Sequence, residues 1–531
     1  MTPVRRLATF LLGEQGMRWL AVGIASAFVA SVASVGQVNS RDERADREMS
    51  AGARPDDGAF GSGPGTRTSS DGLVGGEGQE GTDGSSGGGP GGGSTTGGGS
   101  GGGSTGGGGA FPDHGLRTQG VTDEQVKLGI SYNTSGCGDA GVLEAMIGAG
   151  AAGDMGKAID AYTRHINDNG GIGGRTLKIV IADDGGGGCP EKALSAARRM
   201  VDDEKVFAVI PGLHEVSDYA ASKKVPTFIG RDDPDSLKRL GPNGIGLTQE
   251  IGGNLRAWAA FGHYYLRSER HTPCLVHPEE GVSGNWPLYE KILVARMQDH
   301  GLTFKDIVVY KEDVSTAQQQ SAAAVARLKD KGCDQIYFMA GNPLALIFFT
   351  QAAENAQWRP TWTFTSYMAL ADSELGGRLQ NQAQWENAIG LSTRVPPGEH
   401  PQEGNCKRIY ERYHPGDGQS ESAAAYLACA MLLPAAEMMR RGEGLTGRLD
   451  ANALLAGADS IKNDFYFDAH VPLRWELPAG GPYKTKGWSH YTVVDWSSTR
   501  SAYDFPEYPT YWEVMGPDKS NGVDLRPLFQ R

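Results

Sequence analysis

The stretch RHINDNGGIGGRTLKIVIADD, residues 164–184, decides the fold of this 531-residue chain. Apolar residues before and within its first half have the i, i+3, i+7 spacing of one helix face: Ile159, Tyr162 and Ile166. Its second half alternates apolar residues as a strand does: Leu177, Ile179 and Ile181. Val180 fills the opposite face, which is typical of a strand buried on both sides. The glycines at 170–174 therefore lie between a helix that ends and a strand that begins.

The order of these elements distinguishes a turn from a phosphate-binding loop. A phosphate loop follows a strand and opens a helix, so that the helix N-terminus faces the anion. Here the helix comes first, and Thr176 occupies the place of the third glycine in G-x-G-x-x-G. We expect Gly170 or Gly171 to take a left-handed conformation at the helix end, and Gly173 and Gly174 to turn the chain into the strand.

The net charge of −13 and the pI near 5.4 argue against a nucleic-acid partner, because no basic surface is available to bind phosphates. Residues 1–36 read as a signal peptide or membrane anchor, since arginines precede the uncharged run at 19–36. That order of charges predicts the N-terminus on the cytoplasmic side of the membrane and the rest of the chain on the other side. The run 19–36 is the only predicted membrane contact. Cleavage and retention both stay open, and we favour retention.

Residues 37–117 have the composition of a disordered linker, first charged and then rich in glycine and serine. Fifty such residues would reach roughly 40 Å on random-coil scaling. We therefore predict a folded module that is held extracytoplasmically at a distance from the membrane, or that is secreted after signal cleavage.

From residue 121 onward, strand and helix patterns alternate, which predicts an α/β fold of two doubly wound, Rossmann-like lobes. The first half has predicted strands at 125–131, 177–182, 205–210 and 225–229. The second has predicted strands at 274–277, 304–310, 334–340 and 361–365. After a strand-like segment at 386–395 come helices at 401–413 and 420–440, and then a hairpin that pairs 465–477 with 490–496. We expect the tail at 501–531 to pack along one lobe.

These patterns assign residues 118–247 to lobe 1, 248–386 to lobe 2, 387–458 to a part that returns to lobe 1, and 459–531 to the hairpin and tail of lobe 2. If the lobes close on a ligand, the backbone change should fall near 246–250, 386–394 and 458–464.

Four segments occur in one order: GVTDEQVKLGI, KAIDAYTRHINDNGGIGGRTLKIVIADD, ALSAARRMVDDEKVFAVIPG and VPTFIG. They resemble extracellular solute-binding proteins of the branched-chain amino-acid (Leu/Ile/Val) binding type, which have the type I periplasmic binding fold. The resemblance implies two lobes joined by three crossovers, a small-molecule ligand and an ABC transporter permease as partner. The chain lacks the N-terminal cysteine of lipoprotein members, since no cysteine precedes Cys137.

Catalytic motifs are absent from the sequence. The run GAGAAGDMGKA at 148–158 follows no strand directly, and neither G-x-S-x-G nor H-E-x-x-H occurs. We therefore expect no enzyme activity and no cofactor. Asp183 and Asp184 offer a carboxylate pair for acid–base work, but capping of the next turn and bonds to nearby backbone amides are the favoured interpretation. His277, Glu279 and Glu280 offer a metal site, with cleft lining as the favoured role.

Ligand contacts are expected in the loops that follow the strands, because the carboxyl ends of the strands face the cleft. The candidates in the first lobe are Tyr132, Asn133, Thr134, Ser135, Leu213, His214, Glu215 and Arg231. The candidates in the second lobe are Glu280, Ser283, Trp286, Asn342, Ser366 and Tyr367.

In the family that the chain resembles, hydroxyls and amides of the first lobe hold an α-carboxylate, and an acidic group of the second meets the ammonium. The segment PGLHEV at 211–216 lacks the small hydroxyl cluster expected for that anchor, so the ligand need not be a branched-chain amino acid. We predict binding of an amino acid or a related polar organic solute for an ABC importer. The alternatives are a membrane-tethered sensor that signals through a partner protein, and a hydrolase using Asp183 or Glu280.

Six cysteines in an exported chain predict up to three disulfides, and no C-x-x-C spacing supports zinc. A sheet of order 2-1-3-4 places the loops after strands one and two side by side. This topology predicts the pairs Cys137–Cys189 and Cys274–Cys333. Cys406 and Cys429 lie on consecutive predicted helices, and we expect them to pair if those helices pack antiparallel. The alternative is that one pair stays reduced and buried.

Overall fold

The computed structural model describes residues 114–134, 153–185, 190–232, 234–279, 286–311, 313–340, 343–366, 371–470, 473–474, 490–513 and 522–524. All of these residues belong to one compact unit, Gly109–Arg531. None of the helices in this described part is long and apolar enough to cross a membrane. The predicted signal or anchor at 1–36 and most of the predicted linker lie outside the described residues.

The first sheet is parallel and has the strand order β2-β1-β3-β4-β5, which confirms the predicted order 2-1-3-4. Its strands are β1 (Gln125–Tyr132), β2 (Thr176–Asp183), β3 (Ala208–Ile210), β4 (Thr227–Asp232) and β5 (Gly244–Glu250). No alternation predicts β5, because its sequence GIGLTQE contains two glycines and few β-branched residues. Tyr132 pairs with Asp183 at the carboxyl ends of β1 and β2.

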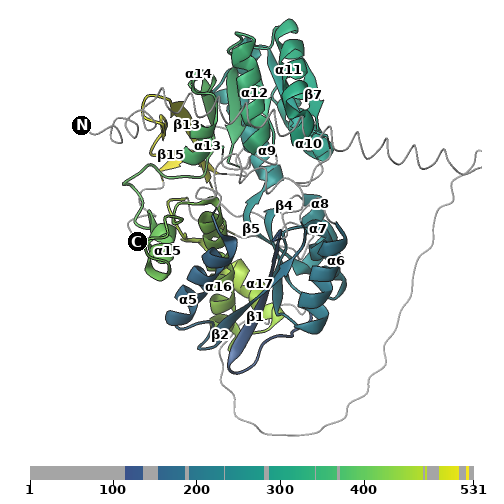
Figure 1. Ribbon diagram of the computed structural model, residues 1–531, viewed down its shortest axis with the longest axis vertical. Helices are drawn as coiled ribbons and strands as arrows, with labels where there is room; N and C mark the ends of the chain where they lie inside the picture. Colours follow the sequence, from purple (N-terminus) through teal and green to yellow (C-terminus); the bar gives the residue numbers. More distant parts are fainter. Residues whose placement is uncertain are drawn as a thin grey trace, which may run out of the picture. The chain divides into compact units, whose positions relative to one another are not determined.

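Helices cover both faces of this sheet, with α5, α16 and α17 on one side and α6, α7 and α8 on the other (Figure 1). They are α5 (Met155–Asp168), α6 (Pro190–Arg198), α7 (His214–Ser222), α8 (Pro234–Leu240), α15 (Asn405–Tyr413), α16 (Ala423–Thr446) and α17 (Ala451–Ser460). The side chain of Asp154 caps α5 by accepting from the backbone N–H of Lys157. The larger core joins distant parts of the chain, as Val126, Tyr162, Leu432 and Leu454 are all fully buried in it.

The glycine-rich segment after α5 is a turn, as predicted. Gly170, Gly171, Gly173 and Gly174 have φ angles of 89°, 61°, 56° and 80°, which only glycine adopts readily. A Cβ atom on Gly171 would lie 1.9 Å from the carbonyl oxygen of Arg175. The segment therefore has a structural role and does not form a phosphate-binding loop.

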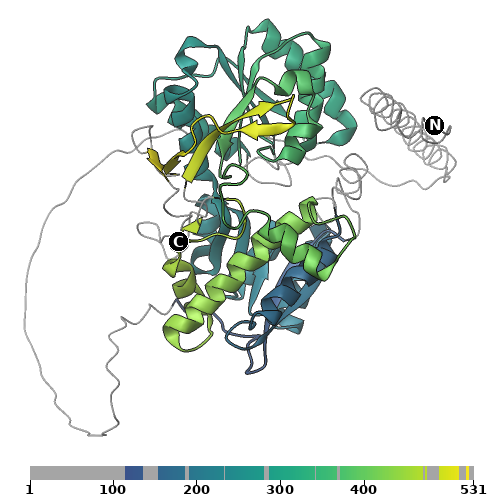
Figure 2. The same cartoon turned by 90° about the vertical axis from the view of Figure 1, so that its left-hand side faces the viewer.

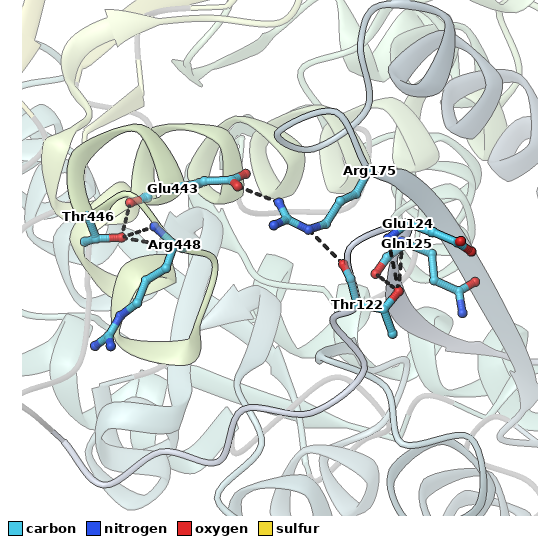
Figure 3. Close-up of polar contacts among 8 residues, drawn as sticks. Thr122, Glu124, Gln125, Arg175, Glu443, Thr446 and Arg448 are labelled. Carbon is cyan, nitrogen blue, oxygen red and sulfur yellow. Dashed lines mark hydrogen bonds and ion pairs between the residues drawn. The ribbon is translucent and has the colours of Figure 1, made fainter.

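The same turn is fixed to α16 by two ionic side chains. Arg175 forms an ion pair with Glu443 of α16 and donates to the carbonyl oxygen of Thr122 at 2.8 Å (Figure 3). Arg440 donates to the carbonyl oxygens of Gly171 at 2.7 Å and Ile166 at 3.1 Å. Helix α16 thus binds the orphan carbonyl groups at the C-terminal end of α5.

The second sheet is mixed and has the order β16-β15-β13-β10-β9-β8-β6-β7, with β14 also paired to β13. Its strands are β6 (Pro273–Pro278), β7 (Ile307–Tyr310), β8 (Gln335–Phe338), β9 (Thr361–Thr365), β10 (Ala388–Ser392), β13 (His490–Ser497), β14 (Ala502–Asp504), β15 (Thr510–Glu513) and β16 (Gly522–Asp524). The C-terminal strands, yellow in Figure 2, run along this sheet. The predicted tail therefore extends the sheet by further strands.

The predicted hairpin is wrong. Strand β13 pairs antiparallel with β10, where Ile389 lies opposite Asp495, and not with the segment at 465–477. Within that segment, β12 (Leu473–Arg474) pairs with β11 (Lys462–Phe465) instead. The open edge of β10 supplies unpaired backbone groups, and covering that edge outweighs a local hairpin.

The helices of the second sheet are α9 (Ile251–Tyr264), α10 (Trp286–Asp299), α11 (Val314–Asp330), α12 (Pro343–Asn355), α13 (Glu374–Leu379) and α14 (Gln382–Trp385). Shorter helical turns are η2 (Arg199–Asp203), η3 (Gly241–Asn243) and η4 (Ser268–Arg270). Helix α12 begins at Pro343, and proline is favoured at the first position of a helix.

Two predicted disulfides are present. Cys274 lies at the start of β6 and Cys333 lies just before β8, and the disulfide between them joins two strands that are neighbours in the sheet. Cys406–Cys429 joins α15 to α16. Cys137 and Cys189 lie outside the described residues, so their pairing stays a prediction.

Within the described residues the chain passes between the two sheets after β5, after β10 and after α17. The second and third passages run side by side. Arg394 and His470 form an isolated antiparallel bridge, and the N–H of Val395 donates to the carbonyl oxygen of Ala469 at 3.1 Å.

Candidate functional site

The carboxyl ends of β1, β2 and β3 are joined by one buried hydroxyl group. Ser131, at the end of β1, donates to Oδ2 of Asp184 at 2.9 Å, and its own Oγ accepts from the N–H of Gly212 at 2.9 Å. The predicted residues Tyr132 and Asn133 follow directly at this edge. The first-lobe candidates after β1 and β3 therefore belong to one edge of the first sheet, as predicted.

Asp183 bonds to nearby backbone amides, which confirms the favoured interpretation for this residue. Its Oδ1 accepts from the N–H groups of Thr134 at 3.0 Å and Gly185 at 3.1 Å. Its Oδ2 accepts from Nζ of Lys192 at 3.1 Å. Asp184 is buried and accepts from Ser131, so the two carboxylates have separate structural partners.

The other predicted ligand residues are placed only in part. His214 and Glu215 open α7, with 3.4 Å between Nε2 and Oε1, and the His214 side chain is 69% exposed. Ser366 follows β9 and donates its N–H to the carbonyl oxygen of Leu391 at 2.8 Å. The backbones of Arg231 and Trp286 lie in β4 and α10, but their side chains are outside the described atoms. The described residues do not include five further candidates, which are Ser135, Glu280, Ser283, Asn342 and Tyr367.

His277 is buried, and its ring nitrogens are both engaged. Nδ1 lies 2.6 Å from the carbonyl oxygen of Pro278, and Nε2 lies 2.8 Å from Oε2 of Glu290. Both partners are acceptors, so neither ring lone pair is turned toward a metal. No cluster of three potential metal ligands occurs among the residues that the structure describes.

A cavity of about 460 Å³ is lined by the two paired segments that connect the sheets, which follow β10 and α17, and by neighbouring helices and loops. Its walls are the loop after β9 at Asp372, the passages at Arg394 and His470, the N-terminal ends of α15 and α16, and Tyr503 of β14. Because these elements belong to or connect both sheets, the cavity is in the position expected for a ligand site. Its volume suits a small organic molecule.

One side of the cavity is a buried hydrogen-bonded chain around His470. Nε2 of His470 lies 2.9 Å from the hydroxyl of Tyr426, and Nδ1 lies 3.2 Å from Oγ1 of Thr393. Burial first, and Arg394 second, lower the pKa of His470 well below its ordinary value. The imidazole is therefore neutral at physiological pH.

The cavity lining also contains a buried carboxyl group, that of Asp372. Oδ2 of Asp372 accepts from the hydroxyl of Ser392 at 2.8 Å, and Oγ of Ser392 accepts from the N–H of Arg394 at 3.0 Å. Burial raises the pKa of Asp372, whereas Arg394 and the Ser392 hydrogen bond counteract this. Tyr503, which also lines the cavity, donates to the carbonyl oxygen of Ala371 and accepts from Nε1 of Trp385.

Arg394 lines the same cavity. Its guanidinium carbon lies 5.9 Å from the centre of the Tyr426 ring, within cation–π range. Its Nε is buried and has no hydrogen-bond acceptor in the part of the chain that the structure describes.

Asp372, Arg394, Tyr426 and His470 are not among the site residues predicted from the sequence. The predicted loop after β9 includes Ser366 and stops short of Asp372, and the segment at 386–394 is predicted only as a hinge. No local pattern marks these residues, because the pairing of two passages distant in sequence brings them together.

Comparisons with known proteins identify the class. The model of a family described as periplasmic binding protein matches residues 139–477, more than half of the chain. This chain belongs to that family, whose members bind solutes and are not enzymes. No curated protein matches the chain.

Solved structures share the fold at low sequence identity. An ABC transporter substrate-binding protein from Aeropyrum pernix is 12% identical, with a TM-score of 0.57 over 76% of this chain and 99% of that one. A branched-chain amino acid ABC transporter protein from Thermus thermophilus with bound valine is 14% identical, with a TM-score of 0.55 over 72% and 96%. A fatty acid ABC transporter substrate-binding protein from Thermomonospora curvata is 17% identical, with a TM-score of 0.52 over 77% and 95%. The fold is thus the type I periplasmic binding fold, as the resemblance implies.

Proposed function

We propose that this chain binds a small polar organic solute outside the cytoplasm, in a cleft between two lobes, and delivers it to an ABC importer. The observation that carries the proposal is the cavity of about 460 Å³ bounded by elements of both sheets and by two passages between them. Membership of a family of solute-binding proteins supports the same function. Tyr132, Asn133, His214, Arg231 and the second-lobe candidates are proposed to form the rest of the cleft wall.

The solved relatives do not share one class of solute. One relative holds valine, and another belongs to a fatty acid transporter. Both solute types carry a carboxylate on an apolar chain, so relatives of this fold accept apolar tails of different length. For this chain we propose an amino acid or a related organic acid.

Mass spectrometry of solutes released by denaturing the purified protein tests the binding function. We expect one stoichiometric small molecule, whose readdition to unloaded protein raises the melting temperature. Delivery is tested separately, by uptake of that labelled solute in cells with and without the gene. A protein that releases no solute and binds none from a metabolite library would contradict the proposal.

A tethered sensor is the second candidate. The uncharged run at 19–36 and the long glycine- and serine-rich segment after it would suit a binding module that stays attached to the membrane. N-terminal sequencing of the mature protein tests the attachment. An intact N-terminus in the membrane fraction, together with unchanged solute uptake in a deletion strain, would favour sensing over delivery.

A further inference from the structure

We propose that the cavity at the passages binds a singly charged carboxylate, and that Arg394 is the group that holds it. This inference rests on the proposed solute-binding function and names the chemical class of the solute. It concerns a residue outside the predicted ligand set, on a passage between the sheets and not on a strand-end loop of the first lobe.

The acidic groups around the cavity already have donors. Glu374 accepts from Arg378 at 2.8 Å, and Glu421 accepts from Lys407. The backbone N–H of Gly398 donates to Glu403. These three carboxylates line the cavity but have partners from their own surroundings, so they do not depend on a bound cation.

The two remaining carboxyl groups are also bonded. Asp468 accepts from the N–H groups of Gly404 at 2.9 Å and Ala469 at 2.8 Å. Asp372 accepts from Ser392 at 2.8 Å. Burial raises the pKa of both Asp372 and Asp468, and the charge of Arg394 acts in the opposite direction on both.

Arg394 is the exception among the charged cavity residues described. Lys407 is paired with Glu421, whereas the buried Nε of Arg394 has no hydrogen-bond acceptor in the described part of the chain. A buried N–H group that has no acceptor is costly unless a ligand supplies one. Among the described residues that line the cavity, the Nε–H of Arg394 is therefore a buried donor whose acceptor an anionic ligand would supply.

A carboxylate fits this requirement better than a phosphate. A planar guanidinium binds a carboxylate through two parallel N–H···O bonds. The lining has two positive side chains, Arg394 and Lys407, against five acidic ones, and Lys407 is already paired with Glu421. Arg394 can therefore compensate one negative charge of a ligand, and a doubly charged phosphate would be repelled. Ala423, at the first turn of the 24-residue helix α16, lines the same cavity, so the positive end of that helix also favours an anion.

The experiment uses the full exported protein and matched pairs of probes. Valerate, L-valine and octanoate are each compared with their primary amides, and inorganic phosphate serves as a separate anion. Binding is followed by melting temperature and calorimetry for the wild type, Arg394→Gln and Arg394→Lys. Arg296→Gln is the control, because Arg296 lies on the surface of α10 in an ion pair with Asp299.

We expect at least one carboxylate, and not its amide, to stabilise the wild type and the control. Arg394→Gln should weaken that binding about 10- to 100-fold, the range for one charge-assisted contact. Arg394→Lys should recover part of it, because the charge remains and the planar fork is lost. Near-ultraviolet circular dichroism checks that each variant is folded.

Equal stabilisation by acid and amide, preference for phosphate, or unchanged carboxylate affinity in Arg394→Gln would overturn the proposal. If no probe binds, the charge of the solute that is released from the purified protein tests the carboxylate subsite. A neutral or cationic solute would refute the subsite and would leave the solute-binding function intact. A protein that neither releases nor binds any solute refutes the subsite together with the proposed function.

Discussion

The glycines after α5 share a positive φ angle but have different surroundings. A Cβ atom on Gly173 would lie 1.6 Å from Oε2 of Glu443, whereas a Cβ atom on Gly174 would meet nothing within 4 Å. Gly174 is therefore required by backbone conformation alone. Gly173 is required by conformation and by the close approach of the Arg175–Glu443 ion pair.

Substituting these two glycines separates the two requirements. We expect Gly174→Ala to lower the free energy of unfolding by about 1 kcal/mol, the cost of a left-handed alanine. Gly173→Ala should cost at least about 2 kcal/mol more, because it also displaces a partly buried ion pair. Urea unfolding of both variants measures the difference. Equal losses would mean that Glu443 moves aside without cost.

His400 makes the fold sensitive to mild acid. It is 5% exposed, and its Nδ1 accepts from the N–H of Gln402 at 3.0 Å, which requires an unprotonated nitrogen. Burial lowers the pKa of His400 to about 4. The folded pKa lies below the ordinary value, so the unfolded chain takes up the proton first, and stability is lost as the pH falls below about 6.5.

The expected loss from this group is about 2 kcal/mol at pH 5 relative to pH 7. Comparing wild type with His400→Gln isolates it, because Asp372 and Asp468, whose raised pKa values act in the opposite direction, cancel in the difference. Urea unfolding at pH 7, 6 and 5 provides the measurement. A stability difference between the two proteins that does not change with pH would contradict the assignment.

At the scale of elements, local sequence patterns predict most of the parallel framework. Strand β9 begins and ends at the predicted residues, and helix α5 contains the predicted apolar face of Ile159, Tyr162 and Ile166. Helix α17 was not predicted. Its Gly457 packs so closely that a Cβ atom would lie 1.9 Å from the carbonyl oxygen of Met438 in α16. A glycine that weakens a helix locally here permits the contact that stabilises it.

The two disulfides should stabilise the fold unequally. Cys274–Cys333 spans 59 residues and Cys406–Cys429 spans 23. Chain entropy predicts about 4 kcal/mol for the first and about 3 kcal/mol for the second. Double alanine variants, compared by guanidinium unfolding, measure both. Because Cys406 lines the cavity, only the second variant should also weaken solute binding.

The candidate site is less predictable than the framework, because it depends on long-range pairing. Strand β13 joins β10 across about a hundred residues of sequence, and Arg394 meets His470 through an isolated bridge. Neither contact has a local signal. The sequence did predict that the loops after β1 and β3 share an edge, because that follows from strand order alone.

At the scale of the whole molecule, we expect solute to draw the two lobes together. The passages near 246–250, 386–394 and 458–464 are predicted to absorb the change. Small-angle X-ray scattering should show a smaller radius of gyration with saturating solute than without it. Superimposable scattering curves in the two states, from protein shown by calorimetry to be loaded, would contradict closure.

The main core is assembled from both ends of the globular part, since β1 packs beneath α16 and α17 and Tyr511 joins the same cluster. During synthesis, strands β1–β5 and helix α5 therefore emerge long before α16 and α17, which complete the cover of one face. A nascent chain with that apolar face only partly covered has less to gain from folding early. A translocation channel that threads this polypeptide from its N-terminus would thus receive an unfolded chain, and the first sheet would be completed only after residues 423–460 had crossed.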